Sequence, residues 1–305
     1  MDTKFNVDDL VEKGLVTKKT YKDGEFKGLS VYKYSRKVFF DNLWNLDGRL
    51  KDCRGIVVDE NNKIISYPFT KVFNFLENNT KVDRDKKVVC VNKMNGFLAT
   101  VKRHKGRLLI STTGSLDSDF AKLARKVIHN QIKVENLHNS LSYMFEICDP
   151  SDPHIIKEES GAYLIGIRSC ALNSPMFSEY MLDATASSLN AKRPEWSIKR
   201  FSDILEESKT CKHEGFMIRD PETCEIICKL KSRFYLQKKA LQRVGKTKVN
   251  EMFDTPIKFK EKLDEEFYGL FDFLIDNYTK EEYFSLKEQE RSELIFKYFD
   301  KGLKG

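Results

Sequence analysis

A lysine-centred motif is the part of the sequence best suited to chemistry. Residues 93–96 read Lys-Met-Asn-Gly and lie between two apolar, strand-like runs. An amine attacks phosphorus only when it is neutral, whereas a free lysine has a pKa of about 10.4. Nearby cations such as Arg54, Lys229 and Lys231, together with partial burial, would disfavour the charged form. The motif therefore predicts covalent transfer of a nucleotide through Lys93.

The pattern K-x-x-G occurs twice, at 93–96 and at 212–215, so the pattern alone does not identify the reactive lysine. Only the first copy lies between apolar runs that predict buried strands, which would hold a catalytic side chain rigidly. In the second copy, Glu214 is the more useful residue. Taken alone, Lys93 would be interpreted as a solvated surface lysine.

Length and composition predict a folded intracellular protein. The chain has 305 residues, of which 40% are hydrophobic and 12% aromatic, enough to bury a core. No apolar run is long enough to cross a bilayer, and the amino terminus lacks an export signal, so we expect an intracellular location, in the cytoplasm or the nucleus. The seven scattered cysteines are typical of reduced thiols. Zinc is disfavoured because Cys211, His213, Cys224 and Cys228 contain no C-x-x-C pair.

One stretch, residues 229–248, is strongly basic. It contains no acidic residue and eight cationic ones: Lys229, Lys231, Arg233, Lys238, Lys239, Arg243, Lys246 and Lys248. A polyanionic backbone would be attracted here, because each neutralised phosphate releases counterions. The alternative is a solvated helix face.

The hydrophobic pattern predicts strands in the middle of the chain and helices at its end. Strands are expected at 54–59, 63–67, 88–92, 97–103, 107–112, 142–147, 162–170, 214–219 and 225–230. A helix at 119–132, capped by Ser118, should pack on a sheet. After residue 232 the period becomes helical, with one stripe of Ile257, Leu263, Phe267, Leu270, Phe271, Leu274 and Tyr278 and another of Leu294, Ile295, Tyr298 and Phe299. We interpret these stripes as the core of a small helical domain.

The order of several motifs resembles the RNA ligase 1 family of phage T4, within the covalent nucleotidyltransferases. The matching segments are 53–57 (CRGIV), 68–75 (PFTKVFNF), 93–96 (KMNG), 114–115 (GS), 145–146 (FE), 163–168 (YLIGIR), 214–217 (EGFM) and 229–232 (KLKS), followed by Tyr235. Together they cover about residues 30 to 240. The resemblance implies an α+β fold, with a nucleotidyltransferase domain of antiparallel sheets and flanking helices over 1–240 and an all-α domain over 241–305.

The resemblance also implies ATP-dependent RNA ligation. Lys93 would attack the α-phosphate of ATP and form a lysyl-AMP. The AMP would then pass to an RNA 5′-phosphate, and a 3′-hydroxyl would displace it and seal the strand. Displacement at phosphorus depends on alignment and on neutralising charge, so Mg²⁺ or Mn²⁺ is expected.

Site residues follow from the matched positions. The implied ATP-binding residues are Tyr32, Arg54, Lys71, Phe73, Gly96, Glu146, Glu214, Lys229 and Lys231. Glu214 also matches the metal-associated carboxylate. Candidates for RNA contact are Arg233, Tyr235, Lys238, Lys239 and Arg243. Two positions depart from the family: Asn95 stands where it has aspartate, and Thr113 where it has a lysine before the glycine. The helical tail is also shorter than in the phage enzyme, so a tRNA preference does not carry over.

Two other functions remain open. A DNA ligase or a GTP-using capping enzyme would keep the lysyl-nucleotide, but such relatives usually carry an oligonucleotide-binding barrel after Lys231, where this chain is helical. A non-catalytic nucleic-acid binder would keep the fold and the basic stretch, and Asn95 is the residue that favours it. No obligate protein partner is evident from the sequence.

Overall fold

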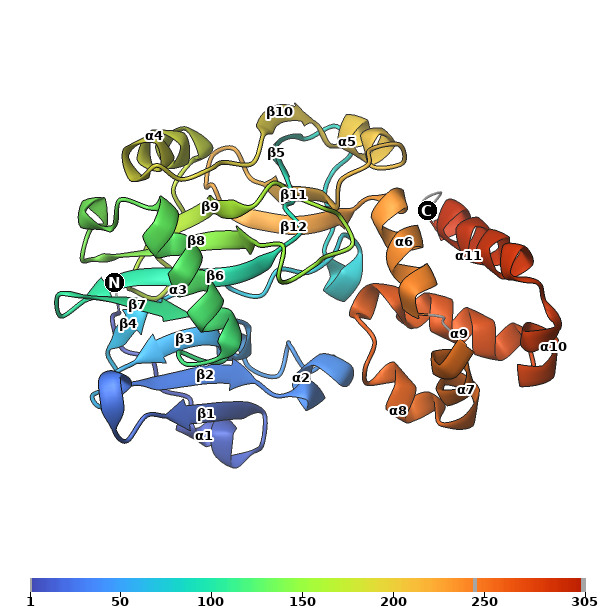
Figure 1. Ribbon diagram of the computed structural model, residues 1–305, viewed down its shortest axis with the longest axis horizontal. Coiled ribbons are helices and arrows are strands. Elements are labelled where there is room, and N and C mark those ends of the chain that lie inside the picture. The colour runs from blue at the N-terminus through green and yellow to red at the C-terminus, as the bar shows by residue number, and fades with distance from the viewer. Residues whose placement is uncertain (1, 244–245, 303–305) are drawn as a thin grey trace.

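The computed structural model describes residues 2–243 and 246–302. All strands of the described residues lie before residue 232, and helices α6 to α11 gather at one side, where Figure 1 shows them in orange and red. Antiparallel sheets with flanking helices, followed by a helical part, confirm the expected α+β fold class.

The described strands form three four-stranded sheets. The amino-terminal sheet has the order β1-β2-β3-β4, formed by Val16–Thr20, Ser30–Tyr34, Arg54–Val58 and Ile64–Ser66. The central sheet has the order β7-β6-β8-β9, formed by Arg107–Ser111, Phe97–His104, Leu141–Cys148 and Gly161–Ser169. The upper sheet of Figure 1 has the order β10-β5-β11-β12, formed by Trp196–Arg200, Lys87–Asn92, Gly215–Arg219 and Ile226–Lys231.

Helices surround these sheets. Those of the sheet-containing part are α1 (Asp8–Glu12), α2 (Arg36–Phe40), α3 (Asp119–Gln131), α4 (Glu179–Leu189) and α5 (Phe201–Glu207). The later helices are α6 (Arg233–Arg243), α7 (Lys246–Asp254), α8 (Pro256–Lys260), α9 (Tyr268–Asn277), α10 (Lys280–Ser285) and α11 (Glu288–Gly302). The predicted start of α3 is confirmed, because the Ser118 hydroxyl accepts a hydrogen bond of 3.2 Å from the amide of Ala121.

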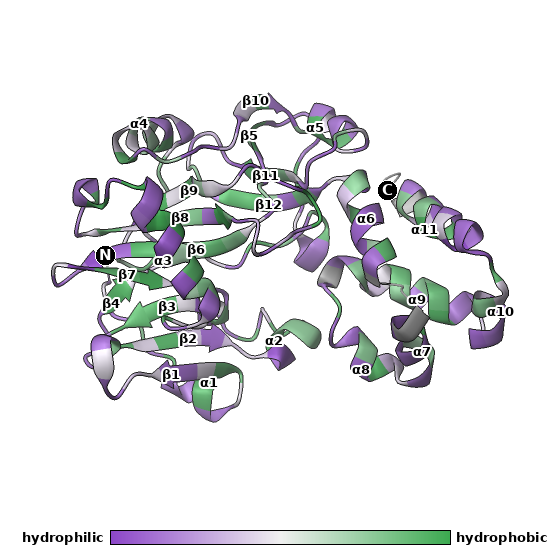
Figure 2. Cartoon of the chain, viewed as in Figure 1, coloured by the Kyte–Doolittle hydropathy of each residue, from purple (hydrophilic) through white to green (hydrophobic). Residues whose placement is uncertain are grey.

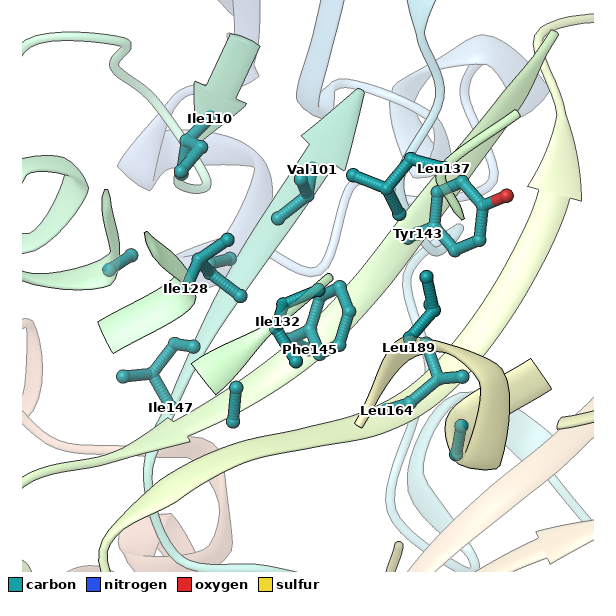
Figure 3. Packing of buried hydrophobic residues seen from close by; sticks show 14 of the residues in the cluster. Val101, Ile110, Ile128, Ile132, Leu137, Tyr143, Phe145, Ile147, Leu164 and Leu189 are labelled. Atoms are coloured by element: carbon teal, nitrogen blue, oxygen red, sulfur yellow. The ribbon is translucent and has the colours of Figure 1, made fainter. Parts of the chain in front are cut away.

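The two faces of the central sheet differ, because one packs into a hydrophobic core and the other faces the cavity. Successive side chains of a strand point to opposite faces. Phe145 and Ile147 point to a core that α3 and α4 cover, and Figure 3 shows this packing around Ile128 and Leu164. Glu146 points the other way, toward the upper sheet. The buried face therefore fixes the register, and the register determines which side chains face the cavity between the two sheets.

The upper sheet repeats this alternation. Cys228 and Leu230 of β12 pack with Phe201 of α5 in a hydrophobic cluster. Lys229 and Lys231, which lie between and after them, face the opposite side and line the cavity. Figure 2 shows hydrophobic residues along much of β12.

The carboxy-terminal helices build their own hydrophobic cluster. It contains Phe267, Leu270 and Ile295, and it also includes Ala240 from α6. The prediction that Ile257 belongs to the core is wrong. This residue is 69% exposed, because α8 is a short helix that buries Phe259 instead.

Among the described residues, no helix is long and apolar enough to cross a membrane. All seven cysteines are free thiols.

Candidate active site

A cavity of about 550 Å³ lies between the central and upper sheets. Its wall includes side chains of the central sheet such as Leu98, of the upper sheet such as Met217, and of the amino-terminal sheet such as Tyr34. Several residues that the sequence singles out line it: Arg54, Lys71, Lys93, Gly96, Glu146, Lys229 and Lys231. Segments far apart in the sequence thus converge on one site.

Lys93 is held where the chain leaves the upper sheet for the central one. Strand β5 pairs with β11, with Asn92 opposite Phe216, and the Lys93 amide donates a hydrogen bond of 2.8 Å to the Gly215 carbonyl. The side chain is 22% exposed, and its Nζ lies 2.9 Å from Oε1 of Glu214. The backbone of Lys93 is therefore fixed while its amine reaches into the cavity.

Glu214 is a buried carboxylate shared by three side chains. It is only 2% exposed, and Oε1 accepts from Nζ of Lys93 at 2.9 Å and from Nζ of Lys231 at 2.7 Å. Oε2 accepts from Nδ2 of Asn95 at 2.8 Å. Burial alone would raise the pKa of Glu214, but the two ammonium groups outweigh it and hold the pKa at about 2. The carboxylate therefore stays ionised beside Lys93.

Lys231 reaches Glu214 because of strand pairing, since Gly215 of β11 lies opposite Lys231 of β12. Its ammonium is also 4.5 Å from the centre of the Tyr235 ring. Burial lowers the pKa of Lys231, but the charges of Glu214 and Glu266 outweigh it and raise the pKa above its ordinary value. This lysine remains cationic, as a phosphate-binding group must.

The side-chain amide of Asn95 both donates and accepts a hydrogen bond. Besides donating to Glu214, it accepts a hydrogen bond of 2.9 Å from the amide of Ile156. Its own backbone amide donates to Oε1 of Glu158 at 3.1 Å. Ile156 and Glu158 belong to the loop between β8 and β9, so Asn95 fastens that loop to the carboxylate beside the nucleophile. Asn95 is buried, with 6% exposure.

Gly96 is required by a close approach of two strands. A Cβ at this position would lie 2.2 Å from the carbonyl oxygen of Ile147, a distance that real atoms do not adopt. The amide of Gly96 instead donates a hydrogen bond of 3.2 Å to Oε1 of Glu146. Burial raises the pKa of Glu146, although the charge of Lys93 opposes this shift.

Arg54 enters the cavity beside a second obligatory glycine. Gly55 has a φ of +96°, and a Cβ there would lie 2.6 Å from the Thr112 carbonyl oxygen. This packing brings the start of β3 against the turn that contains Thr112 and Thr113, both of which line the cavity. The threonine that departs from the family pattern therefore lies at the site.

Lys71 sits among aromatic rings. Its Nζ lies 5.2 Å from the ring centre of Phe39, 5.1 Å from that of Trp44 and 5.3 Å from that of Phe73. Phe73 does not itself line the cavity, but it supports a cation that does. A cation over aromatic faces is stabilised by the ring quadrupoles, so these rings hold the lysine in place.

Tyr32 is not brought to the cavity, contrary to expectation. It is fully buried in the amino-terminal core, where its hydroxyl donates a hydrogen bond of 3.0 Å to Asp8. A register shift between β2 and β3 occurs just after Tyr32, and Tyr34 lines the cavity instead.

The candidates for RNA contact separate into different environments. Arg233 forms an ion pair of 2.9 Å with Asp300, and Tyr235 is only 4% exposed. Lys239 faces the cavity, whereas Lys238 is exposed and lies 4.5 Å from the ring centre of Phe234. Arg243 ends α6, and its side chain lies outside the described residues.

Sequence reasoning missed several cavity residues. Arg219 and Glu179 are buried and form an ion pair in the wall of the cavity, which Met217 also lines. Arg219 follows Met217 by two residues on the same strand, and this spacing could have predicted that both side chains face the cavity. Nothing in the local sequence predicts that Glu179 lines it. At the other end, Asp264 and Glu266 enter from the helical part.

Among the described residues, no group of three or more His, Cys, Asp or Glu side chains is placed to hold a metal ion. Mg²⁺, by contrast, usually binds one or two carboxylates together with water and substrate phosphates. Glu214 is an ionised carboxylate, but both of its oxygens already accept from Lys93, Lys231 and Asn95, so a cation bound there would have to displace one of these donors.

Comparison with known proteins gives a family and a fold. A family model described as RNA ligase matches residues 52–268. No curated protein matches the sequence significantly.

Solved structures of similar fold are ligases. Two structures of an archaeal ATP-dependent RNA ligase, forms 2 and 1, each have a TM-score of 0.60, at 12% and 13% identity. Another, named "Putative ATP-dependent DNA ligase from Aquifex aeolicus", has a TM-score of 0.61 at 14% identity. Each alignment covers 97% of this chain and 76% or 77% of the other. At such identities the likeness concerns the fold alone.

Proposed function

Because the chain belongs to the RNA ligase family of the phage T4 type, we propose that it is an ATP-dependent RNA ligase that joins 5′-phosphate and 3′-hydroxyl ends. One observation carries the proposal: Nζ of Lys93 and Nζ of Lys231 both lie within hydrogen-bonding distance of one buried carboxylate, at the edge of a nucleotide-sized cavity.

Lys93 would be the nucleophile of the first step. Its amine forms the bond to the α-phosphorus of ATP, the bond from that phosphorus to the bridging oxygen breaks, and pyrophosphate leaves. Glu214 holds Nζ in position by its hydrogen bond, and Lys229 and Lys231 face the same cavity, where they neutralise charge on the phosphates. The amine must pass its proton to water before it attacks.

The remaining cavity residues would orient the nucleotide. Arg54 offers a planar fork of donors suited to phosphate oxygens, and Lys71 a point charge. Glu146 would accept a hydrogen bond from the ribose, with Gly96 fixing its position. Tyr32 is left out of this set because it is buried away from the cavity, and Phe73 acts only through Lys71.

A divalent cation, Mg²⁺ or Mn²⁺, supplies further neutralisation of phosphate charge when bound. Glu214 would hold it together with the phosphates of the nucleotide. Removing the carboxylate should therefore weaken both the positioning of Lys93 and the binding of the cation.

In the later steps AMP passes to an RNA 5′-phosphate, and an RNA 3′-hydroxyl then displaces AMP. Lys238 on α6 is exposed and offers a contact for the RNA backbone. Such a reaction would serve RNA repair inside the cell. We also propose a division at residue 240 into an adenylyltransferase domain and a helical domain, with α6 crossing the boundary.

Two alternatives have specific support. A DNA ligase occurs among the structures of similar fold, whereas the matching family model describes RNA ligases, which favours RNA. A non-catalytic binder is favoured by Asn95 in place of aspartate. The paired lysines around Glu214 argue against it, because a binder needs no nucleophile there.

Labelling tests the proposal directly. The protein is incubated with magnesium and α-labelled ATP or GTP and separated by denaturing electrophoresis. We expect acid-labile label from ATP but not from GTP, lost in Lys93→Ala. The matched control is Lys212→Ala, which changes the exposed lysine of the second K-x-x-G copy and should label normally. Absence of label from the unaltered protein would reject the proposal, and sealing of nicked DNA in preference to RNA would replace RNA by DNA as substrate.

A further inference from the structure

A carboxylate of the helical part lies between two lysines of the cavity. Oε1 of Glu266 is 3.5 Å from Nζ of Lys231 and 3.2 Å from Nζ of Lys239. All three side chains are largely buried, with exposures of 9%, 10% and 14%. The segment around Glu266 comes from a short 3₁₀ helix, Glu265–Phe267, between α8 and α9.

These groups continue the ionic contacts of the active site. Lys93 contacts Glu214, Glu214 contacts Lys231, Lys231 contacts Glu266, and Glu266 contacts Lys239. Charges alternate along this row, and Lys231 is shared between a carboxylate of the upper sheet and one of the helical part. An anion that needs Lys231 and Lys239 must therefore compete with Glu266.

Lys239 is built into the cavity rather than into the outer surface of α6. Its Nζ lies 2.9 Å from Asp264 and 5.3 Å from the centre of the Tyr235 ring, the same ring that contacts Lys231. Burial lowers the pKa of Lys239, but Glu266 and Asp264 outweigh it and raise the pKa. Two permanent cations thus share one tyrosine at the end of the cavity that Lys229 also lines.

The same segment closes against the amino-terminal part. The ring of Tyr268, two residues after Glu266, packs edge-on against Phe39 at 6.3 Å and Phe40 at 6.5 Å. Phe39 lines the cavity and contacts Lys71. Segment 264–268 therefore contacts Lys231 and Lys239 on one side and Phe39 and Phe40 on the other.

We propose that Lys239 and Lys231 bind the part of the nucleotide that leaves as pyrophosphate, and that Glu266 occupies this place in the nucleotide-free protein. A polyphosphate carries several negative charges where Glu266 carries one, so it attracts the two lysines more strongly. The carboxylate and the polyphosphate repel each other and cannot both contact the lysines. Entry of the nucleotide therefore moves segment 264–268 away, and departure of pyrophosphate lets it return.

This inference deepens the proposed function and rests on it for the identity of the nucleotide, but it is tested without catalysis. Binding of inorganic pyrophosphate is measured by calorimetry in the absence of divalent metal. We expect Glu266→Gln to bind pyrophosphate about tenfold more tightly, a gain of about 1.4 kcal/mol. Lys239→Met should weaken binding about tenfold and should also remove the gain when combined with Glu266→Gln. The matched control is Glu251→Gln, whose exposed ion pair with Lys262 lies in the same helical part, and it should change nothing.

A second measurement needs no substitution. Hydrogen exchange of the unaltered protein should speed up at the amides of segment 264–268 when pyrophosphate is added. Slower exchange there, or an unchanged affinity in Glu266→Gln, would overturn the inference. If the pyrophosphate results are as expected but ATP leaves no label on Lys93, the inference stands and the proposed ligase function falls.

Discussion

Asn95 donates a hydrogen bond of 2.8 Å from its side-chain amide to Oε2 of Glu214, whereas the two lysines contact Oε1. An aspartate at this position could not donate. The amide that departs from the family pattern thus completes the set of donors around a buried carboxylate, and it does so while its other end holds the loop at Ile156.

Asn95→Asp should therefore destabilise the protein at neutral pH. A buried acceptor would lose its donor and gain a like charge, which costs about 1–3 kcal/mol. The free energy of unfolding in urea measures this loss. The control is Asn92→Asp, because Asn92 also faces a glutamate, Glu195, but at 3.4 Å and at the exposed surface. Equal losses in both variants would show that the Asn95 amide is not required.

Gly96→Ala should separate the two strands that meet at the nucleophile. The added methyl would collide with the backbone of Ile147, at 2.2 Å from its carbonyl oxygen, and backbone cannot rotate away. We expect a loss of about 1–3 kcal/mol and a fall in lysyl-AMP formation. The matched control is Gly48→Ala, where a Cβ meets nothing within 4 Å. A variant at Gly96 as stable and active as the control would contradict the close approach.

Acid should weaken the contact between Glu266 and the cavity lysines. The pKa of Glu266 is lowered from 4.5 to about 2, because the charges of Lys231 and Lys239 outweigh the effect of burial. A carboxyl with a depressed pKa stabilises the fold above its unfolded value and loses this contribution as pH falls toward its folded value. The difference in unfolding free energy between the unaltered protein and Glu266→Gln should therefore narrow from about pH 5 to pH 3.

Urea unfolding at several pH values measures this difference. Taking the difference cancels groups common to both proteins, such as Glu146, whose raised pKa acts with the opposite sign. The control is Glu251→Gln, whose exposed ion pair should contribute less than about 1 kcal/mol at every pH. If the difference in unfolding free energy between the unaltered protein and Glu266→Gln stays constant with pH, the result would contradict the buried ion pairs of Glu266.

Lys238→Ala should weaken RNA binding without altering its sequence preference. An exposed lysine on the basic helix α6 contributes one phosphate contact, so the slope of log affinity against log salt should fall by about 1. Binding of a labelled single-stranded RNA between low and moderate salt measures the slope. Lys280→Ala removes a lysine that pairs with Asp254 in the helical part and serves as the control. An unchanged slope in Lys238→Ala would show that Lys238 on α6 does not contact the RNA backbone.

Much of the sheet arrangement follows from alternation in the sequence. Lys229, Leu230 and Lys231 alternate cationic and apolar side chains, and the structure places the apolar one in the core and the lysines in the cavity. Phe145 and Glu146 divide in the same way. Each of the nine strands expected from the pattern is present, with ends that differ by at most one residue.

Strands with little buried surface are not predicted by the hydrophobic pattern of the sequence. In β1 only Val16 is buried, and β10 at the edge of the upper sheet has no fully buried residue. Their pairing depends on the neighbouring strand rather than on their own hydrophobicity. Tyr32 is missed for another reason: the pairing of β2 with β3 skips Gly55 of β3 between Tyr32 and Lys33, and nothing local in the sequence announces this shift.

The contact between Glu266 and the cavity lysines depends on tertiary structure alone. Glu266 lies in an acidic, helical region, where a carboxylate is expected to be solvated. Only the folding of the helical part against the sheets brings it next to Lys231 and Lys239. Asn95 is similar, because its role depends on Ile156 and Glu214, which are distant in sequence.

The link between β5 and β6 has a mechanical consequence. These strands belong to different sheets and are joined by residues 93–96, so Lys93 lies at the junction of the two walls of the cavity. We therefore expect a substitution that shifts either sheet to displace the amine of Lys93 as well.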